Sequence, residues 1–122
     1  MIVLLDTSFL VSALKFKIDI YDEIARVVPE RHELATLDNV ITELEKLTAR
    51  KEKNAALAMQ LVTHKKVSIY KGKRIQCDDA LVEFAKEKGA LICTQDKELK
   101  QKAKSQKIRV ITIKNKSHLG ED

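Results

Sequence analysis

The stretch MIVLLDTS, residues 1–8, decides the fold, because an unbroken apolar run at Ile2–Leu5 ends abruptly at an acid, Asp6. Short apolar runs without polar alternation are typical of strands in a parallel sheet, which is covered on both faces. A carboxylate next to such a strand is costly unless it is paired or bound. The stretch therefore predicts a buried parallel strand with an acid at its carboxyl end.

The rest of the chain alternates short apolar runs with amphipathic stretches. The expected strands are 2–5, 32–37, 67–70, 90–93 and an edge strand at 109–113, and the expected helices are 7–16, 19–28, 38–47, 53–62, 78–88 and 96–107. The helix starts are assigned to Thr7 or Ser8, Asp19, Asp38, Asp78 and Asp96, and Gly89 is expected to end a helix. This order predicts an α/β fold of three layers, α/β/α, around a central parallel sheet of about five strands.

Length and composition fit one domain spanning residues 1–122, with 44% hydrophobic and 34% charged residues. No apolar run approaches the roughly 20 residues of a membrane span. The apolar N-terminus contains Asp6 and no basic residue before it, so we expect a cytoplasmic protein without a secretory signal. Cys77 and Cys93 lack zinc-site spacing and the histidines are scattered, so neither a zinc site nor a disulfide framework is indicated, although a single disulfide stays open.

Positive charge is concentrated near the C-terminal end. The net charge is +5, and the interval 97–116 contains eight basic residues and one acid, Glu98. A cationic patch at one end of a domain indicates a polyanionic partner, with nucleic acid as the first candidate. A solvated lysine-rich helix face explains this run alone equally well.

Four acids stand where a parallel sheet builds sites. Asp6 and Asp96 follow expected strands, Asp78 begins the helix that leads to the fourth strand, and Glu43 lies on the flank of a buried helical stripe. Taken singly, Asp78 and Asp96 could be helix caps and Glu43 a boundary residue. Together, carboxylates at one sheet edge repel one another unless a cation neutralises them, and oxygen-only ligands suit Mg²⁺ or Mn²⁺.

Four motifs in order resemble those of PIN-domain nucleases. These are Asp6-Thr7-Ser8, Val40-Ile41-Thr42-Glu43-Leu44, Asp78-Asp79-Ala80-Leu81 and Thr94-Gln95-Asp96. The resemblance covers essentially the whole chain, and the segment 9–47 further resembles the branch that joins VapC-type proteins to archaeal nucleases processing ribosomal RNA. It implies a Mg²⁺- or Mn²⁺-dependent endoribonuclease, with a catalytically inactive RNA- or protein-binding module as the alternative.

The resemblance also implies roles for individual residues. Asp6, Glu43, Asp78 and Asp96 would be the catalytic, metal-binding quartet, with Asp79 and Glu98 as further candidate ligands and Thr7, Ser8 and Thr94 as supporting polar groups. On this interpretation, the residues that hold the RNA backbone are Lys71, Lys73, Arg74, Lys97, Lys100 and Lys104. The expected partners are RNA, an antitoxin or a ribosome-assembly protein, and a second copy of the chain packed through helices 19–28 and 53–62.

Overall fold

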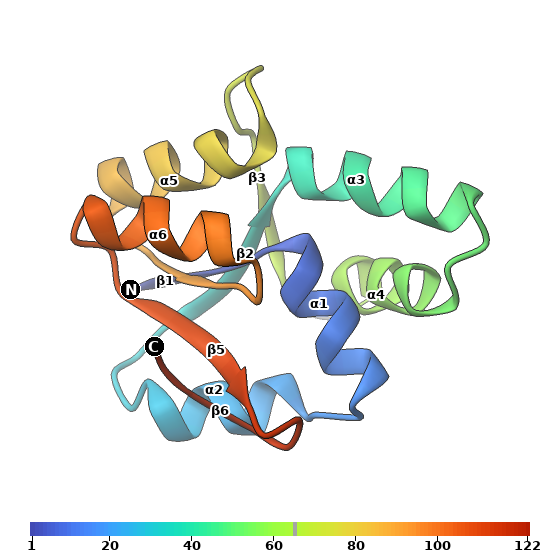
Figure 1. Ribbon diagram of the computed structural model, residues 1–122, viewed down its shortest axis with the longest axis horizontal. Helices are drawn as coiled ribbons and strands as arrows, with labels where there is room; N and C mark the ends of the chain where they lie inside the picture. Colours follow the sequence, from blue (N-terminus) through green and yellow to red (C-terminus); the bar gives the residue numbers. More distant parts are fainter. Residues whose placement is uncertain (65) are drawn as a thin grey trace.

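The computed structural model describes residues 1–64 and 66–122, and its helices and strands follow the predicted alternation (Figure 1). The elements are β1 (Ile2–Leu5), α1 (Thr7–Lys15), α2 (Ile20–Val27), β2 (Glu33–Leu37), α3 (Asp38–Ala49), α4 (Lys53–His64), β3 (Ser68–Tyr70), α5 (Cys77–Lys88), β4 (Leu91–Cys93), α6 (Lys97–Ser105), β5 (Val110–Lys114) and β6 (His118–Glu121).

One sheet with the strand order β3-β2-β1-β4-β5-β6 forms the middle of the molecule. The first five strands are parallel, and β6 is antiparallel to β5. Figure 1 shows α5 and α6 side by side on one side of the strands and α2 on the other. The three-layer α/β prediction is therefore confirmed. The chain reverses its direction of travel at β1 and β4, so the carboxyl ends of these neighbours form the switch point where such sheets bind ligands.

The sheet has one strand more than predicted. The segment 109–113 was expected to form the edge, but β6 pairs with β5 and takes that place. The two strands are joined by a tight turn in which Asn115 and Lys116 have left-handed backbone angles, φ 51° and 56°. β6 is short and contains Gly120 between charged neighbours, so it lacks the apolar run by which the other strands were found.

Three expected helix caps are wrong. Asp6, and neither Thr7 nor Ser8, caps α1 by accepting a hydrogen bond from the backbone N–H of Phe9 at 2.8 Å. Asp38 is the first residue of α3 and not its cap, and its carboxylate accepts a hydrogen bond from the backbone N–H of Gly72. Asp78 lies one residue inside α5, which begins without a side-chain cap. Asp6 and Asp78 nevertheless lie at the element ends where they were expected.

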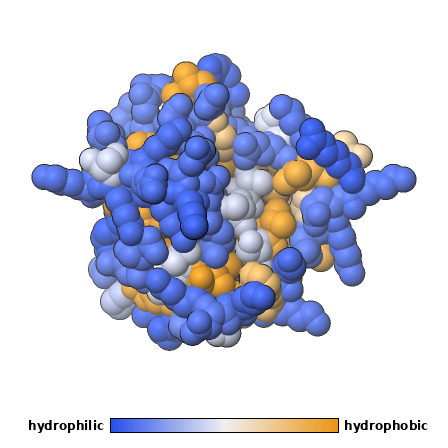
Figure 2. Space-filling view, viewed as in Figure 1, coloured by the Kyte–Doolittle hydropathy of each residue, from blue (hydrophilic) through white to orange (hydrophobic). Residues whose placement is uncertain are grey.

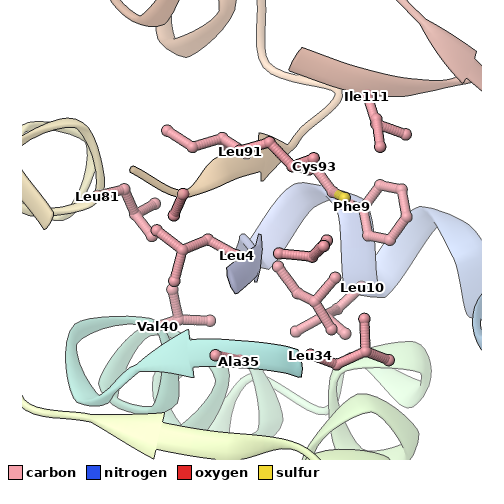
Figure 3. Close-up of a cluster of buried hydrophobic side chains, with 14 of the residues drawn as sticks. Leu4, Phe9, Leu10, Leu34, Ala35, Val40, Leu81, Leu91, Cys93 and Ile111 are labelled. Carbon is pink, nitrogen blue, oxygen red and sulfur yellow. The ribbon is translucent and has the colours of Figure 1, made fainter. Parts of the chain in front are cut away.

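The core fills both faces of the sheet. Figure 3 shows Phe9 of α1 beside Cys93 and Ile111, while Leu4 of β1 lies near Val40 of α3. These side chains are fully or almost fully buried. Because rigid packing holds the strand ends, the residues that follow β1 and β4 are held in fixed positions.

Two expectations about the whole chain can be compared with the structure. Within residues 1–64 and 66–122, none of the helices combines the length and the apolar character that crossing a bilayer requires. Cys77 is a half-buried free thiol and Cys93 a buried one, so the two do not form a disulfide.

Candidate active site

A cleft of about 400 Å³ opens at the carboxyl end of the sheet, and all four acids of the predicted quartet line it. The lining residues are Asp6, Thr7, Ser8, Val11, Ser12, Glu43, Leu47, Asp78 and Asp96. The acids come from four separate segments: the end of β1, the middle of α3, the first turn of α5 and the start of α6. A larger hollow of about 860 Å³, beside Tyr21, His32 and His64, contains none of them.

Asp6 is the buried centre of this cleft, with only 4% of its surface exposed. The hydroxyl of Thr94 donates to Oδ2 at 2.5 Å, and the hydroxyl of Ser8 lies 3.0 Å from Oδ1. The backbone N–H of Phe9 also donates to Oδ1, at 2.8 Å. These donors come from α1 and from the residue after β4, so they hold the carboxylate in one orientation at the switch point.

Burial dominates the protonation of Asp6. Loss of water raises its pKa from 3.8 to about 7, although the hydrogen bonds from Thr94, Phe9 and Ser8 act in the opposite direction. The negative charge of Asp78 adds a smaller increase to the pKa of Asp6. A carboxyl group in this state gains most from a cation, because a bound cation would favour the ionised form that burial disfavours.

Three further acids come close enough to share an ion. One oxygen of each of Asp78, Asp96 and Glu98 lies within 4.8 Å of the other two. Burial, followed by the nearby charge of Asp96, raises the pKa of Asp78. Oxygens that bind one Mg²⁺ at about 2.1 Å are separated by about 3–4 Å, so this group needs only a small contraction. The donor set contains oxygen alone and fits a hard divalent cation.

The two carboxylate oxygens of Asp96 have different surroundings. Oδ1 caps α6 by accepting from the N–H groups of Glu98 and Leu99, at 2.8 and 3.3 Å. Oδ2 accepts no hydrogen bond from the described part of the chain, whereas the N–H of Asp96 donates to Thr94 at 3.0 Å. The cap expected from the sequence is therefore present, and it leaves one oxygen free at the cleft.

Asp78 and Asp79 point to different places. Asp78 lines the cleft, whereas Asp79 lies beside a groove between α5 and α6, with its Oδ1 3.3 Å from the ammonium of Lys102. Neighbouring helical residues are separated by about 100° around the axis, so only one of the pair can face the cleft.

Glu43 lines the cleft from the middle of α3. Its Oε1 accepts a hydrogen bond from the hydroxyl of Thr7 at 2.5 Å, which ties α3 to the start of α1. Ser8 is also within 3.3 Å of the hydroxyl of Thr94 and accepts the backbone N–H of Gln95 at 3.1 Å. All three predicted supporting residues, Thr7, Ser8 and Thr94, thus contact quartet acids.

Sequence reasoning missed three further residues that line the cleft. Val11, Ser12 and Leu47 each lie four residues after a predicted site residue, one turn along the same helix face. That spacing was the available signal. Figure 2 shows near-neutral and hydrophobic residues in the hollow between the positions of α1 and α3, flanked by hydrophilic surface. Gln95, which was quoted in a motif, was given no role from the sequence. Its Oε1 accepts hydrogen bonds from the hydroxyl of Thr112 and from the N–H of Ile113, and these bonds fix the turn after β4.

The predicted RNA-binding residues fall into two groups. Lys73, Arg74 and Lys104 contact acids of this chain, at 2.8 Å from Glu83, 2.7 Å from Asp38 and 2.6 Å from Asp122. Lys71, Lys97 and Lys100 form no ion pair with any residue in 1–64 or 66–122. The second group is therefore available to an external anion without breaking an internal contact.

Comparisons with known proteins agree with this geometry. A family model described as "PIN like domain" matches residues 3–116. The chain is 32% identical over 120 residues to Ribonuclease VapC4 of Methanocaldococcus jannaschii, covering 93% of this chain and 90% of that protein. The solved structure titled "Structure of the PIN domain endonuclease Utp24" matches with a TM-score of 0.86 and 23% identity, over 99% of this chain and 90% of that one. At that identity, the structural match shows the shared fold.

Proposed function

Because this chain belongs to the PIN-like domain family, we propose that it is a divalent-metal-dependent endoribonuclease that hydrolyses RNA phosphodiester bonds. The observation that carries the proposal is the cleft lined by the carboxylates of Asp6, Glu43, Asp78 and Asp96. The name of the ribonuclease relative supports RNA as the substrate class.

We assign the ion to Asp6, Asp78 and Asp96, which line the cleft, with Glu98 as a further ligand. The oxygens of Asp78, Asp96 and Glu98 already lie within 4.8 Å of one another, whereas Asp6 lies outside that group and contributes as a lining residue of the same cleft. Mg²⁺ or Mn²⁺ bound there would activate a water molecule and neutralise charge on the scissile phosphate. Thr94 and Ser8 orient the carboxylate of Asp6 through their hydroxyls. We assign Glu43, held by Thr7, to a second ion or to the orientation of the attacking water.

A cleavage assay tests the proposal. Wild-type protein is expected to cut an end-labelled single-stranded RNA in the presence of Mg²⁺ or Mn²⁺ and to leave it intact in excess EDTA. Glu43→Gln removes a cleft charge and is expected to reduce the rate by at least about tenfold, since removal of a positioned catalytic group typically costs 10²–10⁴. Glu45→Gln changes an exposed acid two residues along the same helix, outside the cleft, and should leave the rate unchanged.

The alternative function is a binding module that holds RNA or a protein and cleaves neither. Wild-type protein that binds RNA but releases no fragments with either ion would favour this alternative. The convergence of four carboxylates on one cleft argues against it, because a surface that only binds RNA has no use for clustered negative charge.

RNA binding is assigned first to Lys71, Lys97 and Lys100. The double variant Lys97→Gln/Lys100→Gln is expected to weaken RNA binding and to lower the slope of log affinity against log salt by about 1.4, at about 0.7 per phosphate contact. Stability should change by less than about 0.5 kcal/mol, since both changes are at the surface. Filter binding at several salt concentrations measures the slope. Lys86→Gln/Lys88→Gln, at the far end of α5, is the matched control. Equal slopes in both variants would show that the lysines of α6 are only solvated surface residues and do not contact RNA.

The family resemblance also supports partner proteins. We propose a homodimer formed through α2 and α4, and a protein partner that is either an antitoxin or a ribosome-assembly protein. Light scattering of the purified chain tests the dimer, with a monomer mass at micromolar concentration as the contrary result.

A further inference from the structure

We propose that the segment 71–76 is a brace that holds α3 and α5 at a fixed separation, and that Asp38 and Arg74 are positioning residues for Glu43 and Asp78. The inference rests on the proposed function, because it concerns the geometry of the same cleft. It gives Lys73 and Arg74 of this basic segment a role other than direct contact with RNA. Figure 1 shows the segment as the loop that projects between the starts of α3 and α5.

The brace is fastened to the start of α3 by side chains of that helix. Oδ1 of Asp38 accepts the backbone N–H of Gly72 at 2.9 Å and the guanidinium of Arg74 at 2.7 Å. The same guanidinium nitrogen donates to the carbonyl of Gly72 at 2.7 Å, which closes the loop on itself. The amide of Asn39 donates to the carbonyl of Lys73 at 2.9 Å. The hydrogen bond from the N–H of Gly72 first, and then the hydrogen bond and charge of Arg74, lower the pKa of Asp38, so it is ionised at neutral pH.

Gly72 shows how closely the brace is seated. It is buried, and a Cβ atom added there would overlap Oδ1 of Asn39 and lie 3.0 Å from Cδ1 of Leu37. Such an overlap is far inside van der Waals distance, so any side chain at this position must displace the loop or Asn39. A segment that is only a flexible carrier of basic residues would not need this approach.

The other side of the brace is attached to α5. The ammonium of Lys73 lies 2.8 Å from Glu83 and 3.5 Å from Glu87, one turn apart on that helix. At the start of the segment, the ring of Tyr70 packs against Phe84 with centroids 5.2 Å apart. The brace thus contacts α3 through Asp38 and Asn39, and α5 through Lys73.

Each of these two helices carries an acid that lines the cleft. Glu43 lies five residues after Asp38 on α3, and Asp78 lies four residues after Arg74, in the first turn of α5. Ligands of one site must be held to within about 0.5 Å, and a displacement of 1 Å can cost about 10² in rate. Exposed ion pairs contribute little to stability. Loss of the brace should therefore change cleft geometry more than folding.

The two partners of the ion pair allow a test in which the competing roles predict opposite results. If Arg74 is a positioning residue, Asp38→Asn and Arg74→Gln should both lower kcat by tenfold or more, while KM and the Kd for RNA in EDTA change less than twofold. If Arg74 contacts RNA instead, Arg74→Gln should weaken RNA binding, and Asp38→Asn, which frees Arg74, should strengthen it; either result would overturn the proposal. Arg109→Gln is the matched control, because Arg109 also pairs with a carboxylate, that of Glu121 at 2.7 Å, and lies outside the cleft and outside α2 and α4.

A second pair of variants tests the brace without changing any charge. Gly72→Ala should reproduce the loss of kcat, and it should cost less when added to Asn39→Ala than when added to the wild type, because Asn39→Ala has already removed both the atom that the new methyl group meets and the hydrogen bond to Lys73. Calorimetric titration with Mn²⁺ alone, without RNA, should show weaker binding in Gly72→Ala than in the wild type and a smaller difference between Asn39→Ala and the double variant. Unchanged Mn²⁺ affinity and kcat in Gly72→Ala would overturn the brace. Because the titration needs no cleavage, its outcome is separate from a failure of the proposed function.

Discussion

In metal-free buffer at pH 8, Asp6→Asn is expected to unfold at a temperature several degrees above that of the wild type, although it abolishes RNA cleavage. The folded pKa of about 7 lies above the unfolded value of 3.8, so the folded chain binds more protons between these two pH values. The wild-type free energy of unfolding must therefore fall as pH rises from about 4 to about 7, by an amount on the order of 4 kcal/mol, and stay low above pH 7. The asparagine of the variant keeps the cap on α1, since its amide oxygen can accept the N–H of Phe9.

In Asp6→Asn, which lacks the titrating carboxyl group, the free energy of unfolding should no longer fall between pH 4 and pH 7. Thermal unfolding between pH 4 and 8 in EDTA measures both effects, and Ser12→Ala, in the same cleft but without a charge, is a suitable control. Added Mn²⁺ should raise the unfolding temperature of the wild type much more than that of Asp6→Asn, because a ligand stabilises only the state that binds it. A variant less stable than the wild type at pH 8, with an unchanged pH profile, would show that the hydrogen bonds fully compensate the burial of Asp6.

The parts of the fold that could be predicted are those with a local cause. Ile2–Leu5 is a strand because an unbroken apolar run needs cover on both faces, and Gly89 ends α5 because its φ of +67° suits glycine. β6 has no such local cause, since its pairing with β5 depends on the turn at Asn115. Asp38 likewise resembled a cap, but a loop more than thirty residues away provides its partners.

The candidate site likewise contains residues that could be predicted from local sequence and residues whose contacts depend on the tertiary structure. Asp6 and Asp96 could be placed at one edge because parallel strands bring their carboxyl ends together. The choice between Asp78 and Asp79 required the orientation of α5, and the internal partners of Arg74 required the packing of two helices. Residue type therefore predicted the chemistry of the cleft, whereas the tertiary structure decides which charged groups remain available to a ligand.

Asp96→Asn is expected to separate the structural and the chemical functions of one carboxylate. Asn is about as good an N-cap as Asp, so α6 should start as before, with the amide oxygen accepting from Glu98 and Leu99. The change removes one charge from the group formed with Asp78 and Glu98, and after burial the charge of Asp96 is the next cause of the raised pKa of Asp78. Without metal, the unfolding temperature should therefore be unchanged or higher.

Cleavage by Asp96→Asn should nevertheless fall by orders of magnitude, because a neutral amide is a poor ligand for a hard divalent ion. The same preparation should bind Mn²⁺ more weakly in calorimetry, so lost activity can be assigned to lost metal. Asp96→Ala is the informative comparison, since it removes both functions and should also destabilise the chain by about 1 kcal/mol through loss of the cap. Wild-type cleavage by Asp96→Asn with Mg²⁺ and Mn²⁺ would mean that Asp96 only caps α6, and that the ion is held by Asp6 and Asp78 without it.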